Sequence, residues 1–304
     1  MPARESGKAA MPESKHEWSI RILEKPEDML EVEELQRVVW TESETDVLPA
    51  HMLLAVAHNG GLVIGAFSGG RLIGMVFGFP GLEFVPDGPI AKHHSHILAV
   101  RPEWRDKGVG YALKRAQWQV VRKQGLNHIT WTYDPLLSRN AYLNIARLGA
   151  VCNTYLKEYY GEMRDGLNVG LPSDRFQVDW WVNTKRAERR LSKRPRRPLT
   201  LADYERAGIK LLYNSPLTRS GNPMPADSFD APTEPLGLAE IPPDFLKLKD
   251  KDMSLARDWR YFSREVFTLS FSTGYIVTDF LYDSTGQQPR SFYVLAHGES
   301  TLEN

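Results

Sequence analysis

The sequence predicts an α+β fold, a mixed β-sheet flanked by helices, with an α/β extension at the C-terminus. Three observations lead to this prediction. A compact apolar run, Ile97–Val100, precedes a glycine-containing turn and an amphipathic helix pattern. Two apolar runs on either side of Ser68-Gly-Gly-Arg71 are typical of a β-hairpin. Strand and helix patterns then alternate to about residue 183.

The N-terminal elements follow from short apolar patterns. Trp18 to Leu23 alternates and predicts a first strand. Pro26 suits the first turn of a helix that runs to about Trp40, and a shorter helix is expected over Ala50 to Ala57. The hairpin strands are expected over 62–67 and 72–79, and residues 80–89 are expected to form a loop.

The chain is organised around the stretch from His94 to Gly110, which predicts a buried strand, a polar turn and the start of a helix. The helix ends at Gln124-Gly125, where glycine suits a left-handed cap. We expect an apolar helix face and a polar, exposed one. The apolar face holds Val109, Ala112, Leu113, Ala116 and Val120, and the polar face holds Lys114, Arg115, Gln117, Arg122 and Lys123.

Further elements complete the predicted sheet. A strand is expected over 127–133, a helix over 138–148, and two strands over 151–160 and 175–182. A helix over 252–271 and a hairpin over 275–282 and 290–296 are expected near the C-terminus. No internal repeat is evident. We predict a disordered tail (1–17), a main domain (18–183), a basic and Pro-rich connector (184–240) and a helix-hairpin extension (241–304).

Composition excludes several classes of function. Lys plus Arg and Asp plus Glu both number 38, so no global field attracts nucleic acid or a membrane. The single cysteine, Cys152, excludes an internal disulfide and a multi-cysteine metal site, and we expect it to be buried and inert. No apolar run approaches the roughly 20 residues that cross a bilayer, and no signal peptide is evident. We expect a cytoplasmic protein.

The turn after Val100 has the properties of a phosphate-binding site. The first N–H groups of a helix have no partners inside it, and the helix dipole makes that end positive. Glycines let an anion approach the backbone, and Arg105 and Lys107 add charge. The alternative is a tight strand–helix turn with no ligand.

This stretch resembles the GNAT superfamily of acyl-CoA-dependent N-acyltransferases. Their pyrophosphate-binding motif, (Arg/Gln)-x-x-Gly-x-(Gly/Ala), is matched by Arg105, Asp106, Lys107, Gly108, Val109 and Gly110. Leu98, Ala99 and Val100 match the strand whose backbone pairs with the pantetheine arm. The resemblance covers about residues 18–183. The whole chain looks closer to one subgroup, the predicted acetyltransferases with a C-terminal extension. Three short motifs are shared with this subgroup: His94-Ser-His96, Asn140-Ala-Tyr142 and Gly170-Leu-Pro-Ser-Asp-Arg175.

The resemblance implies that the chain transfers an acyl group, acetyl by default, from acyl-CoA to the amine of a small molecule. It implies that Ser138 and Asn140 join the CoA-binding residues. Two alternatives stay open: N-succinylation of an amino acid by succinyl-CoA, and a non-catalytic acyl-CoA-binding module. Overall neutrality disfavours a third, an interaction protein that uses the basic connector. A homodimer also stays open.

The helix at 138–148 departs from the family pattern, Asn-x-x-Ala-x-x-Leu-Tyr-x-x-x-Gly-Phe. Aligned on Ala141 and Gly149, the pattern places Ser138 at the Asn and Ile145 at the tyrosine that protonates the CoA sulfur. Tyr142, one turn earlier, is a candidate substitute, or it is a packing aromatic. The thiolate can also leave unprotonated, because free thiols have a pKa of about 8.5.

Two histidines are candidates for the general base. His94 and His96 alternate along a strand and therefore share a face. Histidine titrates near pH 6.5, close to where a base is needed. In register, His94 falls where several GNAT enzymes carry a glutamate base. The alternative is that these histidines only form hydrogen bonds in the core.

Asp134 and Arg175 lie at strand ends where a GNAT acceptor would bind. Either can pair with a charged substrate group, or can form a loop salt bridge or cap instead. We predict no metal site. His93, His94, His96 and His128 lack carboxylate or cysteine partners at the spacings that metal sites show.

Overall fold

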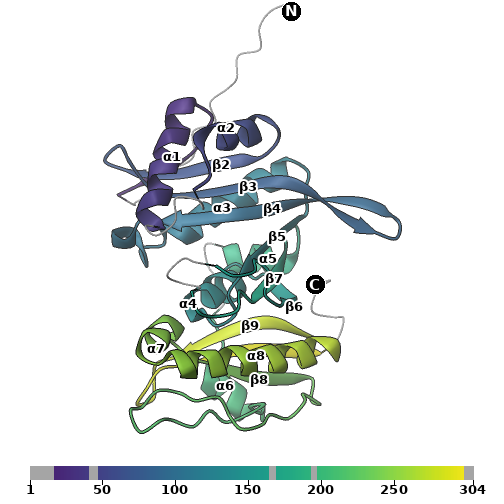
Figure 1. Cartoon of the computed structure of the whole chain (residues 1–304). Helices are drawn as coiled ribbons and strands as arrows, with labels where there is room; N and C mark the ends of the chain where they lie inside the picture. The colour runs from purple at the N-terminus through teal and green to yellow at the C-terminus, as the bar shows by residue number, and fades with distance from the viewer. Residues whose placement is uncertain (1–16, 41–46, 164–168, 193–196, 298–304) are drawn as a thin grey trace, which may run out of the picture.

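A computed structural model describes residues 17–40, 47–163, 169–192 and 197–297. Within them, ten strands form one sheet in the order β1-β2-β3-β4-β5-β7-β6-β9-β10-β8. Figure 1 shows this sheet running from the N-terminal helices to the C-terminal strands. The architecture is the predicted α+β arrangement of a mixed sheet and helices. Residues 1–16 of the predicted tail lie outside the described residues.

The N-terminal part matches the predicted elements closely. It contains β1 (Ser19–Ile22), α1 (Pro26–Val39), α2 (Ala50–His58), β2 (Leu62–Ser68), β3 (Arg71–Val85) and β4 (Gly88–Val100). Met29, Val32 and Leu35 of α1 are buried in one cluster with residues of α2, β3 and β4. Gly69 and Gly70 both have positive φ, 55° and 80°, as a type I′ hairpin turn requires.

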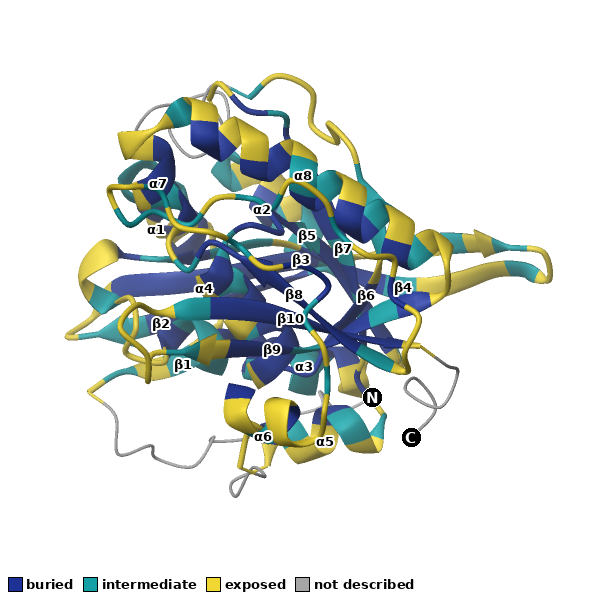
Figure 2. Ribbon diagram, turned by 90° about the horizontal axis from the view of Figure 1, so that it is seen from below, coloured by how far each residue is buried: buried dark blue, intermediate teal, exposed yellow. Residues whose placement is uncertain are grey.

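The predicted loop over 80–89 is wrong, because β3 and β4 continue as a two-stranded arm to the pair Val85–Gly88. β2 pairs with β3 only as far as Gly78. Pro80 therefore lies in a ribbon with one open edge, where a missing N–H is tolerated. The arm projects beyond the rest of the sheet and is largely exposed (Figure 2).

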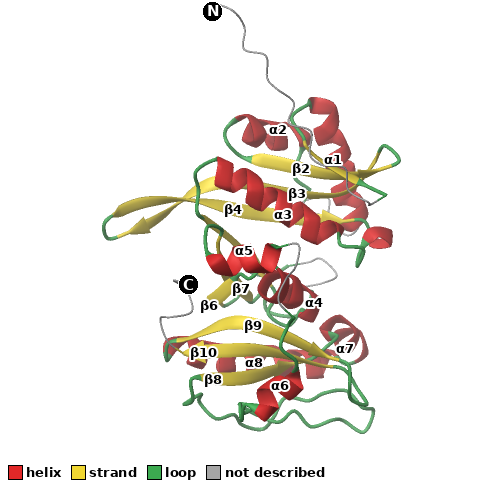
Figure 3. Ribbon diagram, turned by 180° about the vertical axis from the view of Figure 1, so that it is seen from behind, coloured by secondary structure: helices red, strands yellow, loops and turns green. Residues whose placement is uncertain are grey.

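The central part contains η2 (Pro102–Trp104), α3 (Val109–Lys123), β5 (His128–Tyr133), α4 (Ser138–Ala141), the π-helical η3 (Tyr142–Arg147), β6 (Val151–Leu156) and β7 (Arg175–Trp181). Helix α3 covers one face of β3 and β4 (Figure 3). The expected polar face of α3 is partly wrong, because Lys114 and Gln117 are buried. They turn inward because they bond to each other and to a polar residue of β4.

The C-terminal part contains α5 (Lys185–Leu191), α6 (Leu201–Arg206), β8 (Leu236–Ile241), α7 (Phe245–Lys251), α8 (Met253–Ser272), β9 (Tyr275–Asp283) and β10 (Arg290–His297). The predicted long helix and closing hairpin are confirmed. Strand β8 is an addition, since its residues fall at the end of the predicted connector. Residues 193–196 and 298–304 lie outside the described part.

The sheet contains a topological repeat that the sequence does not show. In one unit β5 leads through α4 and η3 to β6 and β7, and β7 lies between the other two strands. In the second unit β8 leads through α7 and α8 to β9 and β10, and β10 lies in the middle. The units meet where β6 and β9 pair antiparallel at Cys152 and Val277. This order is the one that a twofold relation between two βαββ units produces.

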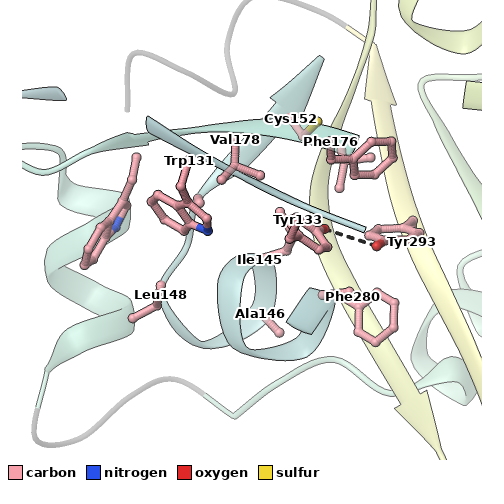
Figure 4. Packing of buried hydrophobic residues seen from close by; sticks show 14 of the residues in the cluster. Trp131, Tyr133, Ile145, Ala146, Leu148, Cys152, Phe176, Val178, Phe280 and Tyr293 are labelled. Atoms are coloured by element: carbon pink, nitrogen blue, oxygen red, sulfur yellow. Dashed lines mark hydrogen bonds between the residues drawn. The ribbon is translucent and has the colours of Figure 1, made fainter. Parts of the chain in front are cut away.

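Aromatic side chains fill the junction between the two units. The hydroxyls of Tyr133 in β5 and Tyr293 in β10 lie 3.1 Å apart (Figure 4). The Phe176 ring of β7 lies 4.8 Å from Phe267 of α8 and 5.4 Å from Tyr293, centroid to centroid. Such pairs contribute about 0.5–1.5 kcal/mol each beyond area burial. The C-terminal strands are therefore packed onto the main sheet as part of one core.

Candidate active site

The parallel strands β4 and β5 open into a wedge. They pair at His93–Ile129 and His94–Thr130 and nowhere further along the chain. From Ser95 and Trp131 onward the two strands separate. The backbone N–H and C=O groups on the β5 side of β4 therefore form no ladder hydrogen bonds with β5 beyond this point. The other edge of β4 is occupied by β3 up to the pair Gly74–Val100. An extended ligand with amide groups can therefore bind along Leu98–Val100.

A β-bulge lies at the apex of the wedge. The register of β3 and β4 shifts there: Phe77 pairs with Ile97, whereas Gly78 pairs with Ser95. His96 is thus the extra residue of β4. The His94 and His96 rings lie 5.8 Å apart, and both lie near the Phe79 ring of β3, at 5.3 and 5.9 Å. The two histidines share one face of the sheet, as their alternation predicts.

His94 is held in its neutral form. Burial, together with charge repulsion from His96, Lys92 and Lys114, lowers its pKa to about 4. At neutral pH the imidazole therefore carries a free lone pair on one nitrogen. That form is the one that can accept a proton.

The glycine turn leaves a helix N-terminus open. Gly108 has φ of 84°, and nothing lies within 4 Å of the position its Cβ would take. The first hydrogen bond of the helix runs from the Ala112 N–H to the Gly108 carbonyl, over 3.0 Å. The N–H groups of Val109 and Gly110 come before this bond and have no acceptor within the helix. A Cβ on Gly110 would make only ordinary contacts, the nearest at 3.7 Å to Leu98. Only Gly108 needs to be glycine for the turn itself.

Cationic side chains surround this turn. Arg105 donates from Nε to the Val100 carbonyl, 3.3 Å. Lys107 places Nζ 4.6 Å from the centroid of the Trp104 ring. Asp106, which has φ of 62°, forms an ion pair with Arg139 of α4. Arg139 was not a predicted site residue, and its position beside the turn is a consequence of the fold. Three cations thus lie around one helix N-terminus, an arrangement suited to phosphate.

The residues predicted on the helix after β5 lie in different surroundings. The Ser138 hydroxyl is buried and lies 2.7 Å from that of Ser291 in β10. Asn140 is half-buried, and Tyr142 is 39% exposed. Ile145, at the position of the family tyrosine, is fully buried. Tyr142 begins the π-helical segment η3, a geometry frequent at functional sites.

Asp134 and Arg175 are both held by structural contacts. Both Asp134 oxygens accept hydrogen bonds from Arg260 of α8, and one also accepts the Leu136 N–H. Arg175 donates to the Asp174 carbonyl, 2.9 Å, and its guanidinium lies 5.2 Å from the centroid of the Tyr160 ring. Asp134 therefore has the geometry of a loop salt bridge and cap, which is the alternative to pairing with a substrate group.

Sequence reasoning missed two groups near the wedge. The first is Tyr160, whose hydroxyl lies 2.9 Å from that of Thr132. Thr132 shares a face of β5 with Thr130, the partner of His94, so Tyr160 lies on the histidine side. The second is a buried polar cluster on the opposite face, made of His93, Ser95, Lys114 and Gln117. The spacing of Lys114 and Gln117, three residues apart on one helix face, was its only sequence signal.

Gly78 makes room for this cluster. A Cβ at Gly78 would come within 2.3 Å of His93 Nε2, and that nitrogen lies 3.1 Å from Gln117 Nε2. Glycine in a strand interior often marks such a close approach. The polar cluster is therefore built into the sheet next to the bulge.

Other sequence expectations concern metals, the thiol and membranes. Among the described residues, no group of three or more His, Cys, Asp or Glu is placed to hold a metal ion. Cys152 is buried, and burial raises the pKa of its thiol well above the usual range, as expected of an inert cysteine. No helix in the described part of the chain combines the length and apolarity that a membrane crossing needs.

An opened pair of parallel strands beside a glycine turn and a free helix N-terminus forms a site suited to an extended ligand that carries a phosphate group. Residues 26–143 match the family model of the acetyltransferase (GNAT) family. These residues include α1, both hairpin strands, the wedge and the glycine turn. This stretch therefore forms a GNAT acetyltransferase domain, and the chain is an acyltransferase.

Several solved structures have a similar fold. A GNAT-family acetyltransferase from Streptococcus pneumoniae is 16% identical, with a TM-score of 0.42, over 53% of this chain and 97% of its own. The ribosomal-protein-S18-alanine N-acetyltransferase of Escherichia coli is 14% identical, with a TM-score of 0.41, over 55% of this chain and 95% of its own. Arabidopsis thaliana Naa50, in complex with a bisubstrate analogue, is 16% identical, with a TM-score of 0.42, over 54% of this chain and 98% of its own. No curated protein matches the sequence.

Proposed function

We propose that the chain transfers an acyl group, acetyl by default, from acyl-CoA to the amine of a small molecule by direct attack on the thioester. The observation that carries this proposal is the wedge between β4 and β5, with the His94–His96 pair at its apex. The glycine turn lies at the other end of the same strand. One strand thus connects a phosphate-binding turn to a pair of candidate bases.

The proposed donor site follows β4. The pyrophosphate of CoA would bind the N–H groups at the start of α3, beside Arg105, Lys107 and Arg139. The pantetheine amides would pair with the open edge at Leu98–Val100. This arrangement directs the thioester to the bulge, where a backbone N–H can polarise its carbonyl.

His94 is the proposed general base. Its pKa of about 4 makes it a weak base for a free ammonium ion. After the amine attacks, however, the nitrogen of the tetrahedral intermediate is far more acidic, so a neutral imidazole can take its proton directly or through a water. His96 lines the same face and is the second candidate.

The acceptor is proposed to approach from the histidine face, where Tyr160 and Thr132 lie. We expect a small-molecule amine handled in the cytoplasm, without nucleic acid or a membrane. Succinyl-CoA with an amino-acid acceptor remains the second donor–acceptor pair. The buried Ile145 at the family tyrosine position favours a binding module as the rival class. A homodimer remains open.

A thiol-release assay tests the proposal. Purified protein is mixed with acetyl-CoA or succinyl-CoA and a panel of small amines and amino acids, and free CoA is followed over time. We expect amine-dependent release with at least one pair. Tight CoA binding in calorimetry with no turnover on any amine would instead identify a binding module.

A further inference from the structure

Lys114 lies at the apex of the wedge, on the face opposite the two histidines. Its Nζ donates to Ser95 Oγ, 2.8 Å, and lies 3.6 Å from the centroid of the Trp131 ring. Ser95 and Trp131 are the first residues of β4 and β5 beyond their last pair, His94–Thr130. The Lys114 ammonium group therefore lies at the point where β4 and β5 separate.

The contacts of Lys114 suit the charged ammonium form. Three acceptors surround Nζ: Ser95 Oγ, Gln117 Oε1 at 3.1 Å, and the face of the Trp131 ring. An ammonium has three N–H groups and no lone pair, so these acceptors match it. The side chain is only 2% exposed, and burial lowers its pKa well below the usual range. The three acceptors act against burial and favour the charged form, on which the inference below depends.

The neighbours of Lys114 supply no negative charge. Ser95 donates to Gln117 Oε1, 3.0 Å, and Gln117 Nε2 lies 3.1 Å from His93 Nε2. His93 is itself neutral, since burial lowers its pKa to about 3. Its Nδ1 is buried without a hydrogen-bond partner. Among the described residues no carboxylate forms an ion pair with Lys114.

A buried cation without a counter-ion is costly, and an apolar residue in its place is often neutral or stabilising. A buried cation of this kind beside an opened strand pair is a candidate for a functional role. The reaction proposed above develops negative charge at this apex, first on the carbonyl oxygen and then on the sulfur of the thioester.

We propose that Lys114 is the electrostatic partner of that negative charge. This inference rests on the proposed acyl transfer. The amine nitrogen attacks the carbonyl carbon, and the C–S bond breaks with its electron pair on sulfur. His94 takes the proton of the attacking nitrogen. The thiolate leaves as an anion stabilised by Lys114, and it takes a proton from solvent after release. No tyrosine at the position of Ile145 is then required.

The test replaces the charge with an apolar chain of similar length, Lys114→Met. We expect kcat to fall by about 100-fold or more, as for loss of one oxyanion-stabilising donor. The KM for acyl-CoA should stay within about twofold, because the charge acts on the transition state. The melting temperature should hold or rise. The matched control is Lys123→Met, at an exposed position of the same helix.

The second readout is the pKa of the thiol of bound CoA, followed through the ultraviolet absorbance of the thiolate. Removal of a neighbouring opposite charge should raise the pKa of the bound thiol by about 1–3 units in Lys114→Met. Lys114→Gln, which keeps a polar group without charge, should show the same rise and serves if the Met variant does not fold.

The outcomes separate this inference from the proposed function. A wild-type protein that turns over while Lys114→Met keeps its kcat and its bound-thiol pKa would overturn the role of Lys114 alone. A wild-type protein that binds no CoA would overturn both. A melting temperature that holds or rises, together with lost turnover and a raised thiol pKa, is the result that we expect.

Discussion

Arg260 of α8 donates from Nη1 to Asp134 Oδ1 over 2.9 Å, and its Nη2 bonds the second oxygen of the same carboxylate. The side chains are 1% and 9% exposed. Asp134 follows the last residue of β5, so this buried pair joins β5 to the C-terminal βαββ unit. Arg264 of the same helix forms a second pair, with the buried Asp174 that precedes β7.

The Arg260 pair gives a prediction about stability. Arg260→Met should lower the free energy of unfolding by about 3–5 kcal/mol, because it leaves the Asp134 carboxylate buried and uncompensated. Urea unfolding at pH 7 measures this change. The double variant Asp134→Asn/Arg260→Met should recover part of the loss. A loss below about 1 kcal/mol in the single variant would be typical of an exposed pair and would contradict the structure.

Truncation tests whether the C-terminal unit is part of the enzyme. A chain that ends after Val182 loses the partners of Tyr133 and Phe176 and exposes the edge of β6. We expect poorly soluble or inactive protein, because large exposed apolar patches and open edges associate. Expression yield, dye binding to exposed apolar surface and thiol release report this. A soluble 18–182 fragment with full activity would show that the unit is dispensable.

The glycine turn gives a prediction about CoA binding. Gly108→Glu places a carboxylate at the helix N-terminus where the pyrophosphate would bind, and calorimetry should detect no CoA binding. The fold should survive, because the space around this position is open. The control is Gly125→Glu at the other end of α3. Gly125 has φ of 80° and equally open surroundings, so this variant carries the same backbone strain. Equal CoA affinity in both variants would remove the turn from the site.

The pH–rate profile tests His94. In wild type, the acidic limb of kcat/KM that belongs to this residue should fall near pH 4, well below the 6.5 of a free histidine. His94→Gln should lose this limb together with about 100-fold or more of the rate, within the usual range for general bases. His96→Gln is the comparison on the same face. A His94→Gln variant with near-normal activity and the same acidic limb would leave a water relay as the better account.

His93 gives a prediction about the pH dependence of stability. Its folded pKa of about 3 lies below the ordinary 6.5, so the unfolded chain binds a proton first as the pH falls. The contribution of neutral His93 is therefore complete above pH 6.5 and is lost progressively from there towards pH 3. His93→Leu should unfold with a shallower pH dependence between pH 6.5 and 4, measured by urea titration. Parallel curves for wild type and variant would mean that His93 does not resist protonation.

Local patterns determined much of the fold. The Gly69–Gly70 turn, α3 and the long helix α8 each follow from information within a few residues: turn glycines, amphipathic spacing and helix ends. The glycine turn at 105–110 could be found for the same reason, since its chemistry lies in consecutive residues. The prediction of a loop over 80–89 is wrong, because the open edge that tolerates Pro80 in a strand exists only in the assembled sheet.

The sequence by itself determined a GNAT-type α+β chain with a glycine turn at a helix start and two histidines on one strand face, since each depends on neighbours along the chain. Only the tertiary structure decided what lies across from them. The helical spacing predicts that Lys114 is exposed, and the structure buries it because Ser95 of β4 and Trp131 of β5 both contact its ammonium group. For Asp134 the sequence leaves substrate pairing and a loop salt bridge open, and only the fold brings Arg260, 126 positions away, into contact with it. Such pairings depend on which strands become neighbours, and the pairing of β6 with β9 is set by packing that no local pattern records.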